Sequence, residues 1–220
     1  MKKLSITQEY LICAVNEKGK ISGFSTEKLV CFVASALLDM QLAGCVSMGG
    51  KKVTVTGDLP SEKSHLRPLY DFINQPKPVK LEKILEEYNY SVTDRRLNEL
   101  MEAVGSSLEE TGLAESAKAG ILSGKKSYTP TKAALDGVIG RLRAAILEGG
   151  EVTKEIAVLV TLLDKSKSLK AYFSDYERRE IGSKLKEIVN TPDGRLLKDM
   201  IDYVDEMTAA MVAAISALGI

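Results

Sequence analysis

The sequence predicts a mainly α protein, a single-domain helical bundle decorated with two short β-hairpins. Apolar residues recur at helical spacing through most of the chain. Two segments, residues 37–55 and 97–130, break this pattern: in each, a helix ends at a glycine and a short strand-like run turns at further glycines. No long linker or low-complexity tract interrupts the chain, so residues 1–220 are expected to form one domain.

The first quarter of the chain predicts two helices and a hairpin. Residues 5–15 place apolar side chains at helical spacing behind Ser5, a suitable N-cap. Residues 27–42, preceded by Ser25 and Thr26 as possible caps, are apolar nearly all round, which is typical of a buried helix. Gly44 ends this helix, and residues 45–56 alternate enough to form a hairpin that turns at Gly49-Gly50.

The middle of the chain predicts short elements. We expect a loop at residues 57–64, a short helix at 65–73, an amphipathic helix at 79–88, a helix at 95–104 and a turn of helix at 108–112. The second hairpin follows and is closed by Tyr128-Thr129-Pro130.

The last third predicts four helices. Thr131 caps a helix to about residue 147, and residues 152–163 form an almost purely apolar core helix. Ser174 or Asp175 caps the charged helix 176–189. The final helix, 195–218, changes from charged to apolar along its length, so its C-terminal half is expected to insert among the other helices.

The charge balance gives no global attraction to nucleic acid or to an anionic membrane. Lysine plus arginine and aspartate plus glutamate each total 30, for a net charge of +0. Any anion must therefore be bound by a local patch. The three cysteines, Cys13, Cys31 and Cys45, lie in apolar runs and are expected to be buried, reduced thiols of a cytoplasmic protein. The apolar segment 209–220 is shorter than the roughly 20 residues that span a bilayer, so contact with a membrane would be peripheral.

Catalysis has no positive support. His65 is the only histidine, no nucleophile pattern marks a partner for it, and we expect it at the surface near a helix start. One histidine and three scattered cysteines do not predict a metal site. We therefore expect no catalytic residues, no metal and no cofactor.

Helix–hairpin units are typical of winged-helix proteins, which bind nucleic acid through a basic helix and wing. Here the helix before the second hairpin carries Glu99, Glu102, Glu109 and Glu110, which is the wrong charge for contact with phosphates. The helix before the first hairpin is too apolar to contact base edges. Nucleic acid is thus an unlikely partner.

The second hairpin is suited to a membrane or a protein partner. Ile121 and Leu122 lie beside Lys118, Lys125 and Lys126, and an apolar tip bordered by lysines can rest in a bilayer interface or contact another subunit. The two apolar side chains could equally cover the adjacent helix.

The order of segments resembles the Golgi phosphoprotein 3-like family, helical proteins that bind phosphatidylinositol 4-phosphate on Golgi membranes and have many prokaryotic relatives. The resemblance rests on LSITQEYLICAVNEKGKI, ALLDMQLAGCVSM, VTVTGDLPSEKSHL, SSLEETGLAE, SYTPTKAALDGVIGRLRAAIL, EIAVLVTLLDKSKSLKAYF, YERREIGSKLKEI and MTAAMVAAISAL, in this order.

The resemblance implies a head-group pocket with an aromatic residue just before the second helix, where this chain has Phe24. It implies arginines near Val33, Asn98 and Met101, none of which is an arginine here. Arg95 and Arg96 lie about one turn earlier and are the candidate substitutes.

Together these observations favour a non-catalytic peripheral membrane protein. It would bind an anionic lipid, such as a phosphoinositide, through Phe24, Arg95 and Arg96, and would contact a membrane or form a homo-oligomer through the hairpin 115–128. A winged-helix-like nucleic-acid or protein-interaction module is the alternative.

Overall fold

The computed structural model describes residues 3–22, 25–91, 93–118, 126–191 and 195–218. It is mainly helical with two small antiparallel sheets, so the predicted fold class is confirmed. Its helices are α1 (Ile6–Ala14), α2 (Thr26–Leu42), α3 (Arg67–Ile73), α4 (Leu81–Asn89), α5 (Arg95–Glu110), α6 (Lys132–Ile146), α7 (Lys154–Lys165), α8 (Asp175–Val189) and α9 (Arg195–Leu218), with short 3₁₀ helices at Ser61–Leu66 and Leu169–Ala171.

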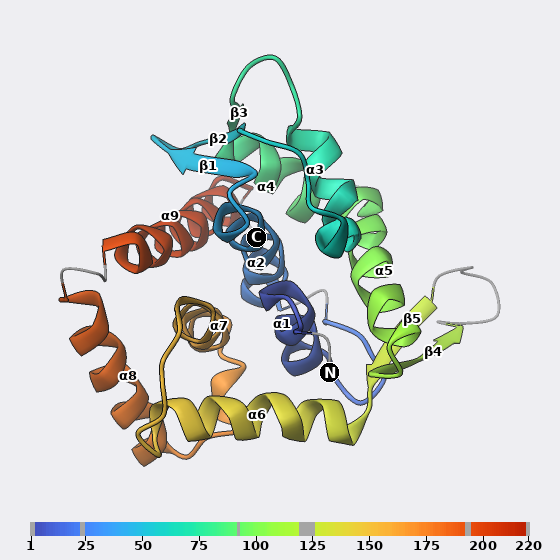
Figure 1. The fold of residues 1–220 in the computed structure, drawn as a ribbon. Coiled ribbons are helices and arrows are strands. Elements are labelled where there is room, and N and C mark those ends of the chain that lie inside the picture. The colour runs from blue at the N-terminus through green and yellow to red at the C-terminus, as the bar shows by residue number, and fades with distance from the viewer. Residues whose placement is uncertain (1–2, 23–24, 92, 119–125, 192–194, 219–220) are drawn as a thin grey trace.

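Three apolar helices form the centre of the bundle. Every residue of α1 is buried, and so is the middle of α2. Helix α7, predicted as a core helix, packs on both and is buried throughout Ile156–Leu163. Figure 1 shows the other helices arranged around these three, with α3, α4 and α5 on one side, α6 below, and α8 and α9 on the other.

Three helix starts follow the predicted caps, whereas the Ser25 side chain at the start of α2 makes no capping hydrogen bond. The Ser5 hydroxyl accepts a hydrogen bond from the Gln8 N–H, and the Gln8 side chain accepts one from the Ser5 N–H in return. The Thr131 hydroxyl caps α6, and Ser174 forms a second such box at the start of α8. These side chains satisfy N–H groups that have no partner within the helix.

The first hairpin gains a third strand that the sequence did not predict. Strands β1 (Val46–Gly49) and β2 (Lys52–Val55) form the predicted hairpin, and β3 (Val79–Lys80) adds to β2. The hairpin turns at Gly50-Lys51, one residue later than the predicted Gly49-Gly50, because Gly49 pairs with Lys52. The predicted helix 79–88 therefore begins two residues later, at Leu81. Val79 pairs with Val53, and the burial of these two β-branched side chains favours the extended form.

The prediction of a helix at residues 95–104 and a separate turn of helix at 108–112 was wrong, because α5 is continuous from Arg95 to Glu110. Gly105 lies in its middle and packs beneath the ring of Tyr128 on β5 (Lys126–Pro130), the partner of β4 (Ala114–Lys118). The Ser106 hydroxyl also lies 2.8 Å from the Tyr128 hydroxyl. Tertiary packing thus keeps a glycine-serine segment helical despite its low helix propensity.

His65 is buried, contrary to the expected surface position. Its Nε2 lies 3.0 Å from the Ser5 hydroxyl oxygen, so it packs against the start of α1. The predicted burial of the three cysteines is confirmed, and burial raises the pKa values of Cys13 and Cys31 to about 12.

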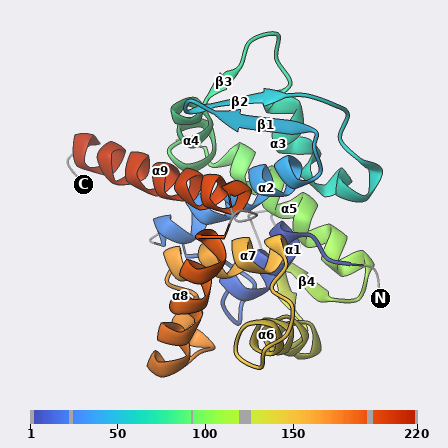
Figure 2. The same ribbon diagram turned by 60° about the vertical axis from the view of Figure 1, so that its left-hand side comes forward.

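Helix α9 is anchored by its charged half. Leu197, Met200, Tyr203, Val204 and Met207 are buried against the bundle. Figure 2 shows the backbone of its C-terminal end extending away from the other helices, which does not match the expected insertion of that half. Within the described residues, no helix is both long and apolar enough to cross a membrane.

Because Gly105 packs against Tyr128, we expect a glycine-to-alanine substitution here to lower stability, which is the opposite of its usual effect in a helix. Glycine to alanine in a helix interior normally stabilises by about 0.5–1 kcal/mol. At Gly105 the new Cβ would come within 2.2 Å of the Tyr128 ring, so we expect Gly105→Ala to destabilise by about 1–3 kcal/mol. Gly137→Ala on α6, where a Cβ meets nothing within 4 Å, should stabilise. Urea unfolding measures both, and a stabilised Gly105→Ala would contradict the packing.

Candidate ligand-binding site

A cavity of about 420 Å³ lies between the end of α1, the loop that follows it, the start of α2 and the first half of α5. We call it the α1–α5 cavity. Its lining is Leu11, Val15, Gly19, Lys20, Ile21, Leu29, Asn89, Asp94, Leu97, Asn98, Met101, Glu102, Lys126 and Tyr128. The size and the mixture of apolar walls and polar groups are those of a small-molecule site.

The loop between α1 and α2 is fixed by its own hydrogen bonds. The Asn16 side-chain oxygen accepts from the N–H groups of Lys18 and Lys20, at 3.0 and 3.2 Å. Gly19 has a φ of +65°, and a Cβ there would lie 2.5 Å from the Tyr128 backbone. The loop can pack this closely on β5 only with glycine at this position.

Two lysines supply the positive charge of the cavity. Lys20 comes from the fixed loop and Lys126 from the start of β5, and both side chains are exposed. Within the described residues neither forms an ion pair. Asp94 and Glu102, from the α5 segment, add negative charge to the same cavity. The cavity therefore offers both ammonium donors and carboxylate acceptors.

The side chain of Asn89, at the end of α4, lacks hydrogen bonds. Both Nδ2 and Oδ1 are shielded from solvent, and neither has a partner within the described residues. An unpartnered buried amide costs about 1–3 kcal/mol. Because Asn89 lines the cavity, a small rotation would offer this amide to a ligand.

The two predicted arginines lie next to the cavity but do not line it. Arg95 is 80% exposed, and its Nε donates to Glu99 on the same helix at 2.8 Å. Arg96 donates to Glu87 at 3.0 Å, and its guanidinium lies 4.6 Å from the centre of the Phe72 ring. The structure therefore does not bring Arg95 and Arg96 together at one site.

The other positions implied by the family resemblance divide into three cases. Asn98 and Met101 line the α1–α5 cavity. Val33 is fully buried in α2. Phe24 lies outside the described residues, as do Ile121, Leu122 and Lys125 of the second hairpin, whereas Lys126 lines the cavity.

Sequence reasoning missed Lys20 and Asn89 and assigned Lys126 only to the hairpin. No motif marks these three residues, because they come from three separate segments that meet only in the fold. In the described part of the chain, no cluster of histidine, cysteine and acidic side chains could hold a metal ion.

Helix α5 followed by β4 and β5 has the element order of a winged helix. Its apolar face, with Leu97, Leu100, Val104 and Leu108, is buried in the bundle. Its charged residues include Glu99, Glu102 and Glu109. This arrangement does not favour contact with nucleic acid.

Fold and cavity define a class, the helical bundles that carry two small antiparallel sheets and a polar, partly cationic cavity between the first and fifth helices. The sequence matches the family model for Golgi phosphoprotein 3 (GPP34) over residues 6–218, nearly the whole chain. The chain therefore belongs to the Golgi phosphoprotein 3 family, which confirms the resemblance in segment order. No match to a curated protein was found.

The unpartnered amide of Asn89 generates a prediction about stability. Replacing it with leucine, which is similar in size, removes two unsatisfied polar atoms. We expect Asn89→Leu to stabilise the protein without ligand by about 1 kcal/mol. The comparison is Asn98→Leu, which loses a 2.6 Å hydrogen bond from Nδ2 to the Asp94 carbonyl. Thermal unfolding of both variants measures the difference, and a destabilised Asn89→Leu would show that the amide has a partner.

Proposed function

We propose that the protein is a non-catalytic peripheral membrane protein that binds the phosphate of an anionic lipid head group in the α1–α5 cavity. The observation that carries the proposal is the meeting of Lys20, Lys126 and the unpartnered amide of Asn89 in one cavity. Asn98 and Met101, where the resemblance implies head-group residues, line this same cavity.

A phosphate could be held here by charge and by hydrogen bonds. Lysine ammonium groups bind phosphate as point charges, and amide N–H groups of asparagine donate to its oxygens. The apolar walls formed by Leu11, Ile21 and Leu29 would accept the less polar part of a head group. The family resemblance suggests phosphatidylinositol 4-phosphate as the lipid to test first.

Arg95 is available to join such a contact. Its ion pair with Glu99 is exposed and spans one helical turn, an arrangement worth only about 0.3–0.5 kcal/mol. Arg96 is more strongly held, because it contacts both Glu87 and the Phe72 ring. We therefore expect Arg95 to contribute more than Arg96. The family resemblance adds Phe24, which precedes α2 in the sequence, as a further residue to test.

Vesicle flotation tests the head-group site. Vesicles of phosphatidylcholine alone, with phosphatidylserine, and with phosphatidylinositol 4-phosphate separate neutral, general anionic and specific binding. Lys20→Gln with Lys126→Gln should reduce binding to the phosphoinositide vesicles by roughly tenfold or more, since each lysine near an anionic surface contributes about 1 kcal/mol.

Lys184→Gln with Lys186→Gln is the matched control, because it removes the same charge from exposed residues of α8, which does not line the cavity. Arg95→Ala and Arg96→Ala, made separately, rank the two arginines. Equal binding by the wild type and the Lys20/Lys126 variant would contradict the proposed site.

The second hairpin is proposed as a contact with a membrane or with a second copy of the chain. Figure 1 shows β4 and β5 projecting from one edge of the bundle. Between these strands the sequence carries Ile121 and Leu122. Ile121→Asp with Leu122→Asp should reduce self-association or vesicle binding without changing the unfolding temperature. Light scattering after size-exclusion chromatography measures the mass, and an unchanged mass with unchanged vesicle binding would exclude this role.

A further inference from the structure

The three-stranded sheet carries only positive charge. Residues 44–57 and 74–80, which contain its strands and adjoining loops, include four lysines and no aspartate or glutamate. The lysines are Lys51, Lys52, Lys77 and Lys80, and all four are exposed. In a chain with a net charge of +0, this is a marked local excess.

Two of these lysines oppose each other directly. Lys52 on β2 is the cross-strand partner of Lys80 on β3. Like charges in such positions repel each other and destabilise a sheet. Within the described residues none of the four lysines forms an ion pair. The repulsion is thus not offset by a carboxylate of the fold itself.

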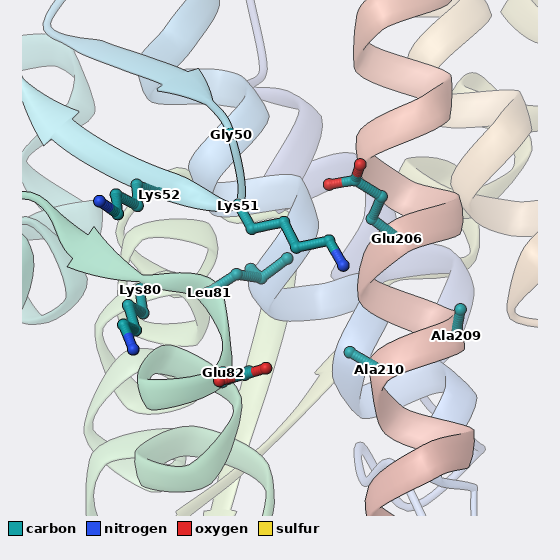
Figure 3. Close-up of a pocket in the computed structure, with 9 residues that line it drawn as sticks. All are labelled: Gly50, Lys51, Lys52, Lys80, Leu81, Glu82, Glu206, Ala209 and Ala210. Carbon is teal, nitrogen blue, oxygen red and sulfur yellow. The ribbon is translucent and has the colours of Figure 1, made fainter.

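The side chains of this pair point away from Glu82 and Glu206, the two acidic residues that line the adjacent cavity. Figure 3 shows a cavity of about 550 Å³ between the hairpin turn, the start of α4 and α9. Lys51 extends across it toward Glu206 and Ala210. The ammonium ends of Lys52 and Lys80 are directed to the other side, away from α9. Their positive charge therefore faces outward.

Lys51 occupies a turn position of the β1–β2 hairpin where the backbone conformation favours glycine. Gly50 and Lys51 both have positive φ, at 57° and 58°. A two-residue turn of this kind favours glycine at its second position, because a Cβ is unfavourable in the left-handed region. The turn thus keeps a lysine despite the strain, but the Lys51 side chain crosses the cavity toward α9 and does not belong to the outward-facing pair.

We infer that the outer face of this sheet is an electrostatic contact for an anionic bilayer. Besides Lys52 and Lys80, this face carries the exposed cross-strand pair Ser47 and Thr54. It has lysines and hydroxyls but no exposed aromatic or arginine, which suits a plane of phosphates better than the stacked bases of single-stranded nucleic acid. The inference rests on the membrane association in the proposed function, but not on the head-group site.

The test uses the full chain and vesicles without phosphoinositide. Co-sedimentation compares phosphatidylcholine vesicles with vesicles that also contain phosphatidylserine. Lys52→Gln with Lys80→Gln should lower the partition coefficient on the anionic vesicles by roughly 30-fold, from the usual contribution of a lysine near such a surface. Binding of the wild type should weaken with added salt more steeply than that of the variant. The control Lys184→Gln with Lys186→Gln, on α8 far from the sheet in Figure 1, should lose little.

A folding defect is separated by thermal unfolding. Because the substitution removes two like charges that oppose each other, the unfolding temperature of Lys52→Gln with Lys80→Gln should be unchanged or higher. A structural role for these lysines would lower it. Equal vesicle binding by this variant and the wild type overturns the inference, and so does binding to DNA in place of vesicles.

The two proposals fail in different ways. If only the Lys20/Lys126 variant loses phosphoinositide binding and the Lys52/Lys80 variant binds anionic vesicles normally, the head-group site stands and the sheet contact is wrong. If only the Lys52/Lys80 variant loses binding to anionic vesicles, the sheet contact stands and the head-group site is wrong. A wild type that binds no vesicle overturns both.

Discussion

The carboxylate of Asp39 organises the centre of this fold. It lies in α2 with 2% of its surface exposed, and it accepts hydrogen bonds from the N–H groups of Ile6 and Thr7 at 3.2 and 2.8 Å. The Thr7 hydroxyl donates to it at 2.7 Å, and the Lys63 ammonium pairs with it at 2.8 Å. With Ser5 and Gln8 capping each other, the first N–H groups of α1 all have side-chain partners. A helix can be buried along its whole length only when its ends are satisfied in this way.

Because α1 is buried along its whole length, its other polar side chains also need partners on neighbouring helices. Gln8 donates to Ser107 on α5 at 2.9 Å, and Glu9 pairs with Arg141 on α6. Burial raises the pKa of Glu9, and the Arg141 guanidinium opposes that shift. Helix α1 is thereby joined to α5 and α6 by polar contacts as well as by packing. The end of α1 and the first half of α5 form two walls of the α1–α5 cavity, so these contacts also set its shape.

The elements that sequence reasoning predicted well are those whose signals are local. The caps Ser5, Thr131 and Ser174 and the core helix near residues 152–163 need only neighbouring residues to be recognised. Three of the errors arise from distant partners. Gly105 is helical because Tyr128 packs on it, Val79 is extended because Val53 pairs with it, and His65 is buried against Ser5. The candidate site also combines residues that the sequence indicated with residues that only the fold reveals. The family resemblance pointed to the positions of Asn98 and Met101. Only the folded chain brings Lys20, Asn89 and Lys126 together.

Among the described residues, no arginine lines the cavity, and this has a consequence for any phosphate bound there. Two lysines provide charge without the bidentate geometry by which arginine selects a phosphomonoester. Recognition of one head group would then be weaker, and firm association would need a further contact elsewhere on the molecule. The lysines of the three-stranded sheet offer such a contact. Charges further apart than about 10 Å are largely screened in physiological salt, so the cavity and the sheet each attract anions only locally. Their effects combine only when one bilayer touches both. A chain with a net charge of +0 can therefore bind an anionic surface, because its lysines are grouped at particular places. It does not need more basic than acidic residues.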